Sequence, residues 1–174
     1  MIKFMKQITI EARTTIYLII AEKMFRKINK NDEKYTYGRE ALDKCWQWVE
    51  CKGILADDLY ELIDSRDCYD ITEFAEDEDD MNRAEVWYAL VDAVSYTIWQ
   101  AYKNENAKYV PQAIEIIKDE LIEDLIQHTT DTGFFYVECI EKLRNYLLEN
   151  YLVDSAWESG AITKEEIMKM VDDN

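Results

Sequence analysis

The sequence predicts an all-α fold, a bundle of six or seven helices that forms a single domain over residues 1–174. Two observations lead to this prediction. Only four glycines and one proline interrupt the 174 residues, whereas sheets linked by tight turns normally need more of both. Hydrophobic residues make up 48% of the chain and aromatic residues 13%, which supports a buried core and is too apolar for a disordered acidic chain.

Apolar residues recur at helical spacing from the N-terminus onward. The first helix is expected over about 7–28, with an apolar stripe that could pack within the monomer or against a second copy. A second is expected over about 37–52, followed by Gly53 at the place of a C-terminal cap. A short third helix is expected over 57–64. One more turn over 71–75 would start at Asp70, which with Glu73 resembles a capping box.

The clearest helix is expected over about 82–103. It is apolar over more than one face, and such a helix is usually central to its bundle. The next helix is expected to begin around Pro111, with Ile114, Ile117, Leu121 and Leu125 on one continuous stripe. A sixth is expected over about 134–152. A short last helix would follow Thr163, which forms a capping-box pattern with Glu166.

Charge is distributed unevenly along the chain. The formal net charge is -17, from 20 basic and 37 acidic side chains. Residues 1–34 carry eight basic and four acidic side chains and are net +4, so the remainder is net -21. The densest part is 57–85, where thirteen acids face only Arg66 and Arg83. Such a field repels nucleic acid and anionic membranes and attracts basic partners.

The N-terminal residues do not resemble a secretory signal, and the longest apolar run near them, Ile16–Ala21, is far too short to span a membrane. The four cysteines form no Cys-x-x-Cys pair, and we expect reduced, mostly buried thiols at positions 45, 51, 68 and 139. The sequence therefore predicts a cytoplasmic protein that binds neither nucleic acid nor membranes. Its oligomeric state stays open.

No catalytic, metal or cofactor site is expected. The single histidine, His128, lacks an orienting third group, and such a residue near a helix end more often caps carbonyls. A di-metal bundle needs two Glu-x-x-His pairs, and position 125 is Leu. An EF-hand loop also fails, because the turn glycine and the distant glutamate are absent near Asp77. The sequence thus favours a protein that is not an enzyme.

One carboxylate pattern leaves an enzymatic alternative open. Glu120 and Glu123, then Glu138 and Glu141, place paired acids on two successive helices that could hold Mg²⁺ against a nucleotide. The pattern resembles the all-α pyrophosphohydrolases of the MazG type, although Glu141 stands where that family has Asp. In a chain with 37 acids, a solvated helix face explains the same spacing.

Residues 76–80 are five adjacent acids, which must be solvated or meet a basic partner. Trp46 and Trp48 are two residues apart, so we expect one of them to be partly exposed as an aromatic anchor. The alternative is a tryptophan that lies under a Lys or Arg stem. The predicted partner-binding residues are Glu73, Glu76, Asp77, Glu78, Asp79, Asp80, Trp46 and Trp48.

The stretch from Ala84 to Ile122 resembles the bacterial polymorphic-toxin immunity proteins of the immunity-six family. The similar features are Val86-Trp87-Tyr88-Ala89-Leu90, then Ala101-Tyr102, then Pro111-Gln-Ala-Ile-Glu-Ile-Ile. This chain has Gln112 where such families show an acidic residue after the proline.

The resemblance implies a protein made beside a toxin, which it binds and neutralises. Many such toxins are nucleases whose clefts are basic because they grip phosphates. A third interpretation, an acidic DNA mimic, needs acids spaced along an elongated surface. Here the charge is concentrated in 57–85 and residues 1–34 are net positive, which disfavours it.

Overall fold

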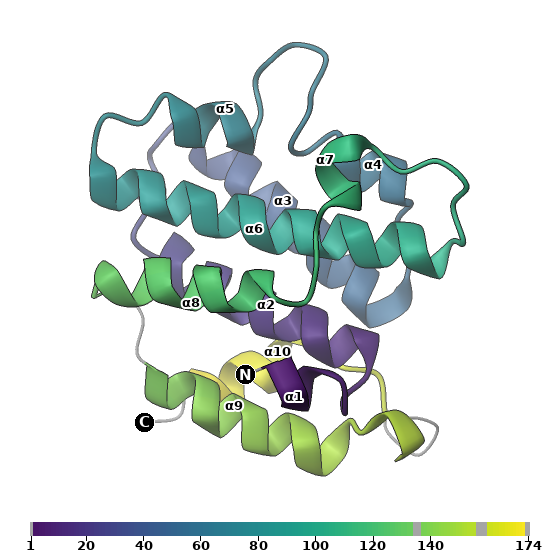
Figure 1. Cartoon of the computed structure of the whole chain (residues 1–174). Coiled ribbons are helices and arrows are strands. Elements are labelled where there is room, and N and C mark those ends of the chain that lie inside the picture. Colours follow the sequence, from purple (N-terminus) through teal and green to yellow (C-terminus); the bar gives the residue numbers. More distant parts are fainter. Residues whose placement is uncertain (1, 134–136, 156–159, 173–174) are drawn as a thin grey trace.

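A computed structural model of the chain describes residues 2–133, 137–155 and 160–172, and helix dominates this part (Figure 1). The all-α prediction is confirmed. The described residues form more helices than the six or seven expected. Several of them are short helices of one or two turns, and one expected helix is broken into two. The helices are α1 (Ile2–Met5), α2 (Ile10–Phe25), α3 (Tyr35–Cys51), α4 (Ala56–Tyr60), α5 (Ile71–Glu76), α6 (Met81–Asn104), α7 (Gln112–Glu115), α8 (Leu121–Asp131), α9 (Val137–Asn150) and α10 (Lys164–Asp172), with a 3-10 turn at Val153–Ser155.

Helix α6 lies at the centre, as its wide apolar surface predicts. Helices α2, α3, α4, α5, α7 and α8 all pack against it (Figure 1). Trp87 and Val94 are buried on one side of the helix, and Ala89 and Tyr96 are buried on the opposite side. Buried Thr97 satisfies its hydroxyl within the helix by donating to the Ala93 carbonyl, at 2.8 Å.

Helix α2 is buried around almost its whole circumference, not along the single stripe that the sequence suggested. Helices α3, α6, α8 and α9 all pack on it, so its apolar surface is used within the chain. The buried hydroxyls of Thr14 and Thr15 donate to the carbonyls of Ile10 and Glu11 one turn earlier. This internal bonding lets polar side chains enter the core without losing hydrogen bonds.

The continuous helix expected after Pro111 is wrong. Helix α7 ends at Glu115, and α8 begins at Leu121. Between them, a carboxylate oxygen of Asp119 accepts a hydrogen bond from the Tyr96 hydroxyl at 2.6 Å, and its carbonyl accepts from Tyr17 at 3.3 Å. These contacts with α6 and α2 hold the irregular segment against the core, and helical periodicity cannot report them.

Helices α1, α9 and α10 all lie on the side of α2 away from α6 (Figure 1). An isolated antiparallel bridge joins Ile8 to Leu152. In it the Thr9 amide donates to Tyr151 at 3.0 Å and the Val153 amide donates to Gln7 at 2.9 Å. Further along, Thr163 caps α10 by accepting from the Glu166 amide at 3.3 Å, as expected.

Two smaller expectations are corrected. The left-handed residue at the end of α3 is Lys52, with φ 53°, and not Gly53. Of the cysteines, only Cys45 is buried among those whose side chains are described, whereas Cys51 and Cys68 are exposed. The side chain of Cys139 lies outside the described residues. No helix in the described part of the chain is long and apolar enough to cross a membrane.

Candidate protein-binding surface

The acidic segment after α5 contains residues with different roles. The side chains of Glu76, Asp77 and Asp79 are exposed. Asp80 caps α6, because its carboxylate accepts the Arg83 amide at 3.0 Å. Glu78 accepts from the guanidinium of the same arginine at 3.1 Å. Only part of the predicted acidic stretch is therefore available to a partner without loss of an internal bond.

Arg83 also brings a distant loop to this segment. Its guanidinium donates to Asp32 at 2.6 Å, so the loop between α2 and α3 lies beside residues 77–80. A hollow of about 470 Å³ opens between them, lined by Asn31, Asp32, Glu33, Lys34, Glu78 and Arg83. The Lys34 amide, with Arg83, holds the pKa of Asp32 below its usual value. Sequence reasoning missed Asp32 and Glu33 because they lie in a segment that is net positive and that is distant in sequence from residues 76–80.

Glu73 lies on α5 and is half-buried. Its helix begins at Asp70, which is buried and accepts the amides of Thr72 at 2.9 Å and Glu73 at 3.3 Å. The same carboxylate accepts from the Ser65 amide at 2.8 Å, which closes the preceding loop. The N-cap expected at Asp70 is confirmed, and it fixes the direction in which α5 presents its acids.

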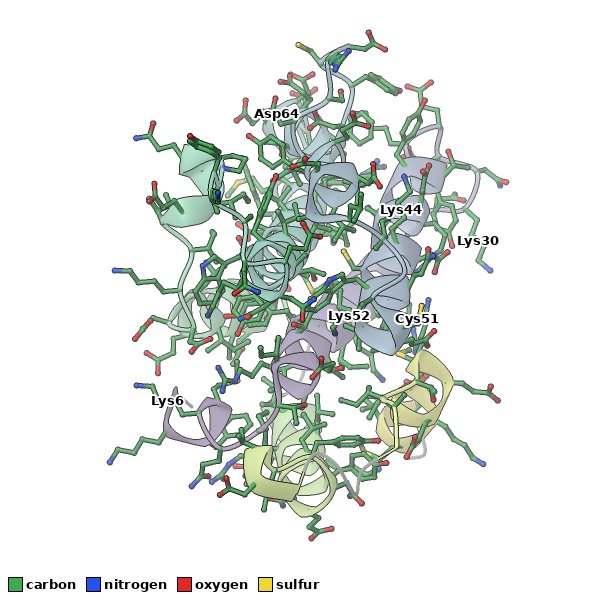
Figure 2. All side chains as sticks on the ribbon, turned by 90° about the vertical axis from the view of Figure 1, so that its right-hand side faces the viewer. Lys6, Lys30, Lys44, Cys51, Lys52 and Asp64 are labelled. Carbon is green, nitrogen blue, oxygen red and sulfur yellow. The ribbon has the colours of Figure 1, made fainter. Side chains whose placement is uncertain are left out.

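The acids of 57–64 also serve the fold. Asp57 on α4 accepts the Tyr102 hydroxyl at 2.6 Å, and Asp64 accepts the Tyr60 hydroxyl at 2.7 Å. The bond to Asp64 raises the pKa of Tyr60 to about 12. Helices α4 and α5 both lie along α6 in Figure 1, and Figure 2 places Asp64 at the end of the molecule opposite Lys6.

The expectation that Trp46 or Trp48 is exposed is wrong. Both are buried, at 2% and 1% exposure, because α3 is covered on opposite sides. The Trp46 indole donates to Glu22 of α2 at 3.0 Å. The Trp48 ring lies under Lys52, whose ammonium is 3.7 Å from the ring centroid, so the lysine-covered alternative holds for this residue. Neither side chain offers an anchor to a partner.

Exposed aromatic side chains lie elsewhere, next to the acids. Tyr37 on α3 is 42% exposed, and Tyr69 in the loop before α5 is 43% exposed. Their ring centroids are 5.1 Å apart in an edge-to-face arrangement. The sequence held no signal for this pair, because each tyrosine taken alone resembles an ordinary helix or loop residue.

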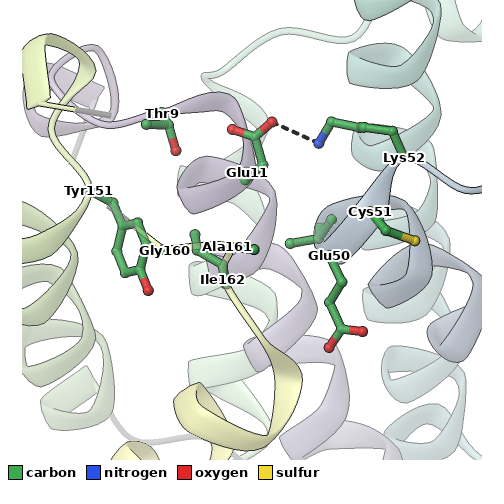
Figure 3. A pocket seen from close by; sticks show the side chains of 10 residues that line it. Thr9, Glu11, Glu50, Cys51, Lys52, Tyr151, Gly160, Ala161 and Ile162 are labelled. Atoms are coloured by element: carbon green, nitrogen blue, oxygen red, sulfur yellow. Dashed lines mark ion pairs between the residues drawn. The ribbon is translucent and has the colours of Figure 1, made fainter. Parts of the chain in front are cut away.

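Figure 3 shows a second hollow, of about 410 Å³, where the end of α3 meets residues 160–162. Glu11 and Lys52 form an ion pair across its rim, at 2.7 Å. Burial opposes ionisation of Glu11, but the hydrogen bond and charge of Lys52, together with bonds from the Glu11 amide and from Thr9, outweigh it and lower the pKa of the carboxyl. Its lysine is held by Glu11 and by the Trp48 ring, and the Glu50 carboxylate that also lines it accepts the Lys164 amide at 2.8 Å.

The residues of the enzymatic alternative belong to α9, to α8 and to the position just before α8. Glu120 precedes α8, which packs on α6 and α2, whereas Glu141 is exposed on α9, which packs on α10 and α2. Glu123 is exposed on α8. The side chains of Glu138 and His128 lie outside the described residues. Among those that are described, no group of three His, Cys, Asp or Glu residues could hold a metal ion.

The fold and this surface together describe an all-helical protein that presents exposed acids and tyrosines around a buried core. A family model for immunity protein Imm6 matches residues 12–132, which is more than half of the chain. The chain belongs to the Imm6 immunity protein family. Its members are toxin immunity proteins, which bind a cognate toxin and are generally not enzymes. Neither the curated proteins nor the solved structures yielded a match.

Proposed function

We propose that this protein, acting as a single domain in the cytoplasm of the producing cell, neutralises a nuclease-type toxin domain by covering its basic cleft. The contact is the acidic surface, which consists of Asp32, Glu33, Glu73, Glu76, Asp77, Glu78, Asp79 and Asp80. The observation that carries the proposal is the meeting of two distant acidic segments through Arg83, next to the exposed carboxylates of Glu76, Asp77 and Asp79.

Charge complementarity supports this choice of partner. A nuclease cleft grips phosphates with Lys and Arg side chains, so it attracts a surface rich in carboxylates. Glu76, Asp77 and Asp79 make no ion pair with any other described side chain, so they can meet toxin cations without breaking an internal bond. Electrostatic steering can raise association rates to about 10⁸–10⁹ M⁻¹s⁻¹ at low salt. A fast encounter suits a protein that must reach the toxin before the toxin reaches its substrate.

The test neutralises the three exposed acids together in the variant Glu76→Gln/Asp77→Asn/Asp79→Asn. We expect association with the toxin domain encoded beside this protein to slow by about tenfold at low salt, since steering contributes 10- to 1000-fold. The measurement is stopped-flow binding at two ionic strengths, together with rescue of growth when the toxin is expressed.

The control variant, Glu149→Gln/Asp154→Asn/Glu165→Gln, removes the same charge from exposed acids of α9, the 3-10 turn and α10. It should associate nearly as fast as the unmodified protein. Equal slowing in both variants would mean that net charge, and not this surface, steers the encounter. Unchanged association in the first variant would place the contact elsewhere.

A further inference from the structure

We propose that Tyr37 and Tyr69, the tyrosine pair, anchor the complex by receiving an arginine or lysine side chain of the toxin over their rings. This inference rests on the proposed function, since it names the anchor within the same interface. In this proposal the partly exposed tyrosine pair is the aromatic anchor, in place of the buried Trp46 and Trp48 that the sequence suggested.

The pair is held in place by the core. Phe74 lies beneath both rings, with centroids 5.6 Å from Tyr37 and 4.7 Å from Tyr69, and is itself only 2% exposed. It packs in turn on Trp87 of α6, at 5.4 Å. Aromatic residues fixed in this way lose little conformational entropy on binding, which is why they are common hot spots of interfaces.

The surroundings of the pair favour a cation. Within the same aromatic cluster, the chain's own Lys34 already places its ammonium 5.1 Å from the Phe74 centroid. Desolvation, together with the negative charge of Glu33 and Asp32, raises the pKa of the Tyr69 hydroxyl above its usual value. A toxin cation above the rings would therefore gain both the cation–π attraction and the field of the neighbouring carboxylates.

The other exposed tyrosines lack this combination. Tyr88 on α6 is 44% exposed and lines a groove with Glu85, Ala89, Asp92 and Leu125. Tyr109 is 90% exposed in the segment between α6 and α7. Among the described residues, Tyr37 and Tyr69 are the two exposed tyrosines whose rings contact each other. Tyr88 is therefore a matched control of equal exposure.

The experiment measures dissociation of the full-length protein from its toxin domain. Tyr37→Ala and Tyr69→Ala should each dissociate about 30-fold faster or more, as expected for hot-spot aromatics, with little change in association rate or salt dependence. Tyr37→Phe and Tyr69→Phe should restore slow dissociation, because they keep the ring. Tyr88→Ala should dissociate like the unmodified protein. Thermal melts of each variant confirm that the fold is kept.

The outcomes separate this inference from the proposed function. If the alanine variants dissociate normally while the neutralised acidic surface still slows association, the anchor is wrong and the function stands. If the phenylalanine variants dissociate as fast as the alanine variants, the hydroxyls make the contact and the ring–cation proposal fails. Equal acceleration by Tyr88→Ala also overturns it. If the unmodified protein does not bind the toxin, the proposed function itself fails.

Discussion

Glu22 of α2 is a buried carboxylate that accepts from three different side chains. It is 5% exposed and accepts from Arg39 at 2.8 and 2.6 Å, from the Trp46 indole at 3.0 Å, and from Lys164 at 2.8 Å. Burial opposes ionisation, but the bonds from Arg39 and Lys164 outweigh it and lower the pKa of Glu22. A buried carboxylate is tolerated here because its oxygens are bonded to charged donors.

Replacing Glu22 with Gln should destabilise the protein by about 3 kcal/mol at neutral pH, the low end for a broken buried pair, because both cationic partners reach solvent. The depressed pKa sets the pH dependence. The stability that the ionised Glu22 carboxylate contributes is complete above its ordinary pKa of 4.5. This stability is lost as the pH falls through the lower pKa of the folded state. The difference between the two proteins should therefore be largest near neutrality and shrink below about pH 4.5. Urea denaturation across pH measures it.

The control for this prediction is Glu40→Gln, since Glu40 makes an exposed pair with Lys44 at 2.7 Å one helical turn away. Its cost should stay near about 0.3–0.5 kcal/mol. A difference between the unmodified protein and the Glu22 variant that stays constant from pH 7 to pH 3 would show that the carboxylate charge is not what stabilises the core.

At the scale of elements, α10 shows how the C-terminal part of the chain completes the fold. It lies beyond the residues matched by the family model. Lys164 at its start reaches Glu22 and Asp43, and Asp172 at its end pairs with Lys23 and Arg26 of the α2 region. Two apolar side chains, Ile167 and Val171, are buried along its inner face. Ion pairs at both ends therefore position this short helix, and the burial of Ile167 and Val171 stabilises its packing.

Shortening the buried side chain with Ile167→Ala should loosen α10 without unfolding the core. The loss, about 2 kcal/mol or more for such a truncation, should appear as faster amide hydrogen exchange in α10 while α6 stays protected. Lys169→Ala, at an exposed position of the same helix, is the control and should change exchange little. If α6 exchanges faster to the same degree, α10 opens only with the whole molecule.

At the scale of the whole molecule, the net charge of -17 acts on folding and, in the proposed function, on binding in opposite directions. Like charges repel within the compact state, whereas the same field attracts a basic partner. Salt screens both effects, since the Debye length is only about 8 Å at physiological ionic strength. Changing the salt concentration alone can therefore distinguish repulsion within the folded protein from attraction of a partner.

Raising the NaCl concentration from about 10 mM to 150 mM, which shortens the Debye length, should raise the Tm of the free protein and slow its association with the toxin. Each 1 kcal/mol of relieved repulsion is worth about 2–4 °C for a chain of this size. The variant Glu76→Gln/Asp77→Asn/Asp79→Asn should show a smaller rise in Tm. A Tm that falls with added salt would mean that ion pairs, such as those of Glu22, outweigh repulsion in the folded state.

The sequence predicted what depends on local pattern. The wide apolar surface of residues 82–103 indicated the central helix, and Asp70 and Thr163 marked helix starts, because capping and periodicity involve only near neighbours. The segment Ala84–Ile122 also carried the family resemblance that the match to Imm6 confirms. The sequence predicted one helix where the structure has a break after Glu115, because Asp119 is held by tyrosines of two distant helices.

What the sequence by itself determined is the fold class, the family and the uneven charge, since composition and spacing are properties of the chain alone. Only the tertiary structure decided which of the candidate residues are exposed. Packing on both sides of α3 buried Trp46 and Trp48, Arg83 joined Asp32 to Glu78 across the chain, and Phe74 set Tyr37 beside Tyr69. The physical reason is that exposure depends on which other elements cover a side chain, and that is fixed only when distant segments pack.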